Sequence, residues 1–235
     1  MADPAALRYS RSMSAPPPSP TCPAHLHDDA YERPVTTRYV DPLEVIWLAT
    51  ATRLGLTIRR DPNVFSMTDG EGMLWFSTRE HLDEDDNLAQ MLFHELVHWI
   101  TNGTETFHQR DWGFPLYDGL DPREHAALRL QAWWSGRHGL REWMGPTGGY
   151  RQYYAQIPDD PLHAIDDSRW EAAVVALAKD AVSRAQGAPF WAPIEAALTA
   201  TAQLRSSLAP FAADYRSEHP EDPLPLHWLQ RHPTD

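Results

Sequence analysis

One short segment of the chain has the residue types and the spacing to bind a metal ion: His94-Glu95-Leu96-Val97-His98. On a helix, two histidines four residues apart project from the same face, so both imidazoles can reach one tetrahedral Zn²⁺. Glu95 lies about 100° around the helix from His94, close to the metal without binding it. A carboxylate there can take a proton from a zinc-bound water, whose pKa the metal lowers. The segment therefore predicts a zinc site with a general base beside it.

The neighbouring residues predict that this segment lies on an amphipathic helix of about residues 85–101, with Asn102-Gly103 as its stop signal. Its apolar residues fall together on the side opposite His94: Ala89, Phe93, Leu96, Val97 and Ile100. Burying two histidines and a glutamate on one polar face would be costly without a metal. The pattern therefore favours zinc over a set of merely hydrogen-bonded histidines.

The segment Met91–Ile100 resembles the active-site helix of the zincin metallopeptidases, and the resemblance covers about residues 40–140. The order of the preceding elements is also similar: a helix, short strands, then an aromatic-rich strand at Met73–Ser77. The resemblance implies hydrolysis of a peptide bond. It also implies that Met73–Ser77 is the edge of the sheet over the cleft, where a substrate adds as an antiparallel strand.

Catalytic zinc sites usually take a third protein ligand. The metzincin continuation requires glycine and histidine at positions that here hold Thr101 and Thr104. The gluzincin arrangement instead takes a glutamate from a later helix, and the resemblance to small gluzincins implies Glu124. His108, on the loop after the active-site helix, is the rival third ligand.

Small gluzincins often carry an aspartate four residues after the ligand glutamate, where it steadies a zinc histidine. Here that position is Leu128. An orienting group must therefore come from elsewhere if Glu124 is the ligand.

Two further sets of residues could shape the reaction. Zincins often stabilise the oxyanion with a downstream tyrosine or histidine, and a loop predicted after the second ligand helix carries four candidates, for which simple packing is the alternative: Tyr150, Tyr153, Tyr154 and His163. The aromatic stretch 107–117, with Trp112 and Phe114, predicts a cleft wall that selects apolar side chains.

Residues 1–34 are rich in proline and serine and predict a flexible arm. Its Cys22, with His25 and His27, could bind metal. A Cys22 thiolate on the catalytic zinc would resemble the cysteine switch of zincin proenzymes. No switch motif surrounds it, so a disordered arm with an incidental cysteine is the favoured interpretation.

The remaining pattern predicts an α+β fold: a small, twisted, mostly antiparallel sheet packed on the active-site helix, with a helical C-terminal half. A helix opens at Asp41-Pro42, a strand follows at 56–59, and the strands 64–67 and 73–77 flank a glycine-bearing turn. A helix opens at Asp121-Pro122, and two amphipathic helices cover about 166–186 and 190–208. The predicted division is a catalytic core at 35–145, a helical part of the same domain at 146–213 and a tail at 214–235.

The chain has 235 residues and a formal charge of −13 without a basic stripe, which argues against nucleic acid and anionic membrane surfaces as partners. It shows no signal peptide or membrane-spanning stretch, and its single cysteine fits a cytoplasmic setting. The sequence thus predicts zinc-dependent hydrolysis of a peptide or protein substrate, with Glu95 as the base. The alternatives are a non-catalytic zincin-fold binding protein and a zinc hydrolase acting on a small molecule. The oligomeric state is not predicted.

Overall fold

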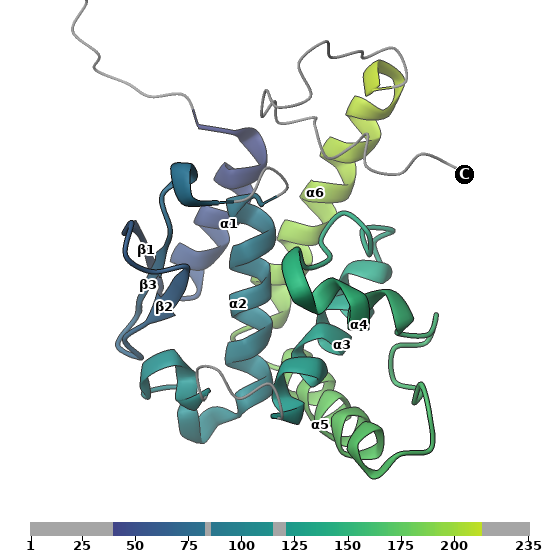
Figure 1. Cartoon of the computed structure of the whole chain (residues 1–235). Coiled ribbons are helices and arrows are strands. Elements are labelled where there is room, and N and C mark those ends of the chain that lie inside the picture. Colours follow the sequence, from purple (N-terminus) through teal and green to yellow (C-terminus); the bar gives the residue numbers. More distant parts are fainter. Residues whose placement is uncertain (1–39, 83–85, 115–120, 213–235) are drawn as a thin grey trace, which may run out of the picture. The chain divides into compact units, whose positions relative to one another are not determined.

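The computed structural model describes residues 40–82, 86–114 and 121–212, so the predicted N-terminal arm and C-terminal tail lie outside the described residues. The described part is an α+β structure, as the sequence predicts, and most of it is helical (Figure 1). Its helices and strands, in chain order, are α1 (Pro42–Arg53), β1 (Thr57–Arg60), β2 (Ser66–Thr68), β3 (Met73–Phe76), α2 (Leu88–Asn102), α3 (Pro122–Gly136), α4 (Arg151–Gln156), α5 (Arg169–Ala185) and α6 (Trp191–Ala212).

The sheet has three strands in the order β1-β3-β2. The predicted hairpin is confirmed, because β2 and β3 pair in antiparallel fashion, with Ser66 opposite Phe76. The prediction of a mostly antiparallel sheet is wrong, because β1 pairs with β3 in parallel, with Thr57 opposite Met73. The hairpin turn folds the chain back, so that β3 runs antiparallel to β2. The strand β3 lies between β1 and β2 and pairs with both.

The prediction that Met73–Ser77 forms the edge of the sheet is also wrong, because β3 is the central strand. Its Leu74 and Phe76 have no exposed surface, which fits a strand with a neighbour on each side. The edge strand β2 instead carries the hydroxyl residues Ser66 and Thr68 on the face that Leu74 and Phe76 share.

Helix α2 lies at the centre of the described structure, with the sheet and α1 on one side and α3 and α5 on the other (Figure 1). It begins at Leu88, later than predicted, because the side chain of Asn87 accepts a hydrogen bond from the backbone N–H of Gln90 (2.9 Å). Its apolar residues form the middle of the core, where the rings of Trp47 and Phe93 pack 5.0 Å apart.

Helices α3 and α5 pack against each other through a buried ion pair. The Arg129 guanidinium, which has no exposed surface, donates to Glu171 and to the Tyr153 hydroxyl (2.8 Å). Because Tyr153 belongs to α4, this network fixes three helices against one another and sets the position of α3 beside α2. Within the described ranges, no helix is both long and apolar enough to cross a membrane.

Candidate metal centre and its cavity

The two histidines of α2 lie side by side on its polar face. The Nε2 atoms of His94 and His98 are 3.0 Å apart, so both ring nitrogens face the same position beside the helix. The opposite face of α2 is buried, with Phe93 and Val97 fully enclosed. The amphipathic pattern of the helix therefore decides which way both imidazoles point.

Glu124 of α3 meets these histidines. Its carboxylate oxygens lie 3.6 Å from His94 Nε2 and 3.2 Å from His98 Nε2. Asp121 caps α3 by accepting from the Arg123 N–H (2.9 Å), and Pro122 occupies the first turn, so Glu124 stands near the start of the helix. One donor atom from each of the three side chains lies within 4.8 Å of the others, a group that could hold a metal ion.

Gln131 orients His94. The Gln131 amide nitrogen donates to the carbonyl of Met144, so its Oε1 is the acceptor facing His94 Nδ1 at 2.9 Å. The proton of the neutral His94 ring is thereby placed on Nδ1, and Nε2 presents a lone pair to the cluster. Gln131 is fully buried and supplies the orienting contact that Leu128 cannot make.

The electrostatics of the cluster favour a positive charge at its centre. Burial disfavours the His98 imidazolium, but the charge and hydrogen bond of Glu124 outweigh this and raise the pKa of His98. Burial likewise disfavours the Glu124 carboxylate, but His98 and His94 lower its pKa to about 2. His98 Nδ1 and Glu124 Oε1 are buried and have no hydrogen-bond partner among the residues that the structure describes. Two imidazole nitrogens and a carboxylate oxygen form a donor set that fits zinc and related divalent transition metals.

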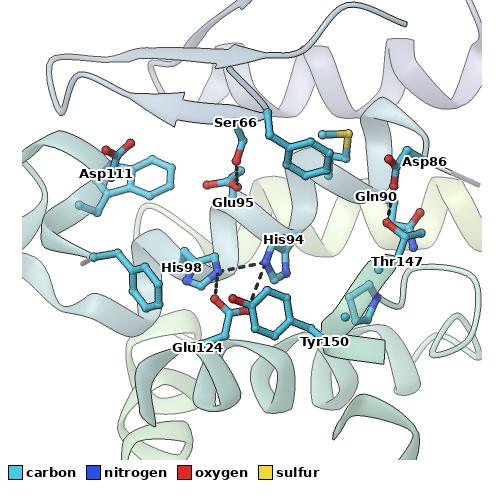
Figure 2. Close-up of a pocket in the computed structure, with 17 residues that line it drawn as sticks. Ser66, Asp86, Gln90, His94, Glu95, His98, Asp111, Glu124, Thr147 and Tyr150 are labelled. Carbon is cyan, nitrogen blue, oxygen red and sulfur yellow. Dashed lines mark hydrogen bonds and ion pairs between the residues drawn. The ribbon is translucent and has the colours of Figure 1, made fainter. Parts of the chain in front are cut away.

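The cluster forms one wall of a cavity of about 360 Å³ (Figure 2). Figure 2 shows Ser66 and Glu95 on one side of the cavity and Glu124 and Tyr150 on the other. Among the described residues, the lining includes four carboxylates and no lysine or arginine. Its apolar surface comes from six side chains: Phe65, Met91, Trp112, Phe114, Pro146 and Tyr150. Such a cavity suits a partly apolar ligand without negative charge.

The segment after α2 builds one end of the cavity. Asp111 and Trp112 both adopt left-handed backbone conformations, with φ of 49° and 48°, and both line the cavity. Asp111 Oδ1 accepts from the Thr68 N–H (3.0 Å), and the Trp112 carbonyl accepts from Asn102 (3.1 Å). These contacts hold an uncommon backbone conformation beside the cluster.

The predicted aromatic wall is present in part. Trp112 and Phe114 line the cavity, and the Phe114 ring lies 5.0 Å from that of His98. Phe107 instead packs against Trp99 and Phe190 in the core. Tyr117, Cys22, His25 and His27 lie outside the described residues.

The structure brings one of the four oxyanion candidates to the cavity, namely Tyr150. Tyr153 stacks on His125 and bonds Arg129 and Glu171, while the Tyr154 hydroxyl is bonded to the Arg141 carbonyl (2.8 Å). Both belong to α4, so the predicted loop is helical there.

The two other histidines that the sequence proposed for the site, His163 and His108, do not join the cluster of His94, His98 and Glu124. His163 is exposed and pairs with Asp160 at 3.1 Å. The rival ligand His108 is exposed on the loop after α2, so the structure brings Glu124 and not His108 to the two histidines.

Gln131 and Ser66, which hydrogen-bond His94 and Glu95, have no role in the sequence predictions. Gln131 follows Glu124 by two helical turns, so its placement on the same face of α3 was available from the spacing. Ser66 donates to Glu95 Oε1 at 2.7 Å across the gap between β2 and α2, a contact that no local spacing indicates. Comparisons of this chain with protein-family models, with curated proteins and with solved structures find no match.

Proposed function

We propose that the chain is a zinc-dependent hydrolase of a peptide or other amide bond. The observation that carries this proposal is the meeting of His94, His98 and Glu124 from two helices, with Glu95 lining the same cavity. A buried structural clip for zinc has no need of a cavity or of a second carboxylate, here Glu95, beside its ligands. This combination therefore supports a catalytic site over the non-catalytic alternative.

In the proposed reaction, His94, His98 and Glu124 hold the metal and Gln131 orients His94. When bound, zinc supplies Lewis-acid polarisation of the carbonyl and acidifies water. Glu95 takes a proton from the attacking water as the water oxygen bonds to the carbonyl carbon. It later gives that proton to the leaving nitrogen as the C–N bond breaks. Tyr150 donates a hydrogen bond to the carbonyl oxygen as negative charge develops there.

The substrate in this proposal is a peptide or protein with an apolar side chain near the cleaved bond, because the cavity combines aromatic walls with carboxylates. A small amide is the alternative substrate that the cavity volume also admits. We place the reaction in the cytoplasm, since one cysteine in the chain fits a reducing setting.

The test combines metal content with turnover of a fluorogenic peptide library in the wild type, Glu95→Gln, Glu124→Ala and the control His108→Ala. The proposal expects Glu95→Gln to keep about one zinc per chain and lose at least ~10²-fold in kcat. Glu124→Ala should lose zinc, and His108→Ala should retain both zinc and turnover. Full zinc affinity in Glu124→Ala, or unchanged turnover in Glu95→Gln, would contradict the proposed site.

A further inference from the structure

The side chain of Glu95 has three rotatable torsions and lies at a cavity wall, so something must hold its carboxylate in place. In the part of the chain that the structure describes, the hydrogen bond that reaches this carboxylate comes from Ser66, whose Oγ donates to Glu95 Oε1 at 2.7 Å. This length is the ordinary distance of a well-formed O–H···O hydrogen bond. One carboxylate oxygen is thus held, and the other remains available for proton transfer.

Ser66 lies where the inner face of the sheet meets the cavity (Figure 2). It is opposite Phe76 in the antiparallel register, and Thr68 is opposite Leu74, so all four residues share one face. Phe76 and Leu74 are fully buried, whereas Ser66 ends this row with a hydroxyl. The Ser66 hydroxyl at this position has its hydrogen-bond partner in Glu95 of α2.

The backbone of β2 is itself held on both edges. On one edge, the carbonyl of Phe65, just before β2, accepts from the N–H of Ser77, just after β3 (2.9 Å). On the other edge, the Thr68 N–H donates to Asp111 Oδ1 (3.0 Å). The Ser66 hydroxyl is therefore carried by a strand that cannot easily shift relative to α2.

We propose that Ser66 is a positioning residue that sets the direction of the Glu95 carboxylate in the cavity. The inference rests on the proposed function for its catalytic consequence, because Glu95 acts there as the base. Without the hydroxyl, Glu95 populates several rotamers and spends less time beside the reacting water. The hydrogen bond of the Ser66 hydroxyl goes to Glu95 and not to one of the three proposed metal ligands, so its loss should act on turnover and not on zinc affinity.

Turnover of the fluorogenic peptide library by zinc-loaded protein tests the catalytic consequence. Ser66→Ala should lower kcat by about 10- to 100-fold, the scale of losing an oriented contact to a reacting group, while KM and zinc affinity change less than about twofold. Ser66→Thr keeps the hydroxyl and should recover kcat to within about threefold. The matched control is Thr68→Val, which removes a hydroxyl from the same strand and face whose bonds are to Met73 and Gly70. It should leave kcat unchanged.

A double-mutant cycle on urea unfolding of the metal-free protein tests the bond itself, using Ser66→Ala, Glu95→Ala and the double variant. Coupling that changes the unfolding equilibrium constant by about 5- to 15-fold supports the contact. Additive effects of the two substitutions overturn the inference, as does an unchanged kcat in Ser66→Ala. A wild type that binds zinc without turnover refutes the proposed function instead, and the unfolding cycle still decides whether Ser66 holds Glu95.

Discussion

Replacing Gln131 with leucine should weaken zinc binding although all three proposed ligands remain. The substitution removes two groups of the fully buried Gln131 side chain. One is the acceptor facing His94 Nδ1 (2.9 Å), and the other is the donor to the Met144 carbonyl. The His94 ring is then free to rotate or to move its proton to Nε2, where it blocks the metal. Loss of such an outer contact typically costs ~10- to 100-fold in metal affinity, or about 1.4–2.8 kcal/mol.

The stability of the metal-free protein should fall as well, because the buried Met144 carbonyl loses its partner, at a cost of about 1–3 kcal/mol. Gln131→Glu separates the two effects. It keeps an acceptor for His94 Nδ1 but loses the donor to Met144, so it should lose stability while keeping zinc affinity within a few-fold of wild type.

The assay is a competitive zinc titration against a chromophoric chelator at pH 7, with chemical unfolding of each metal-free variant beside it. A Gln131→Leu protein that binds zinc within about twofold of wild type would refute the reasoning. So would a Gln131→Glu protein as weak as Gln131→Leu, because an acceptor at this position would then be irrelevant.

Three further predictions concern stability, each measured by urea unfolding. In the metal-free protein, the raised pKa of His98 adds stability that is complete below its ordinary value of 6.5 and is lost as pH rises through the folded value. The lowered pKa of Glu124 adds stability that is complete above 4.5 and is lost as pH falls toward about 2. Stability from this pair should thus be greatest at about pH 4.5–6.5, and an identical profile in Glu124→Gln would contradict it. Trp47→Ala should cost about 3–5 kcal/mol, because it empties a fully buried site; a cost below ~1 kcal/mol would show that the core collapses to fill it. Glu171→Ala should also cost about 3–5 kcal/mol by leaving the Arg129 charge buried and unpaired, and replacing Arg129 with methionine as well should recover part of it; no recovery would contradict that cause.

The long helices could be predicted because their signals are local, whereas the short α4 was predicted as a loop. Asp41-Pro42 and Asp121-Pro122 mark helix starts in the sequence, and α1 and α3 begin at Pro42 and Pro122. The pairing of strands was harder, because it depends on segments that are not neighbours in the chain. The hairpin of β2 and β3 follows from its turn, whereas the parallel pairing of β1 with β3 has no turn to indicate it.

Among the oxyanion candidates, the sequence could not separate Tyr150 from Tyr153 and Tyr154. All three lie within five residues, but α4 turns Tyr153 toward Arg129 and Tyr154 toward the Arg141 carbonyl, while Tyr150 precedes the helix and faces the cavity. The direction of each ring depends on a short helix whose position is set by its packing on α3.

The sequence by itself determined the pairing of His94 with His98 and the nearness of Glu95, because residues on one helix have fixed directions relative to one another. Only the tertiary structure decided that Glu124 meets them, that Gln131 orients His94 and that Ser66 reaches Glu95. These residues belong to separate elements, whose relative positions depend on packing across the whole core. A helix specifies its own face through local periodicity, but what lies opposite that face is set by the rest of the chain.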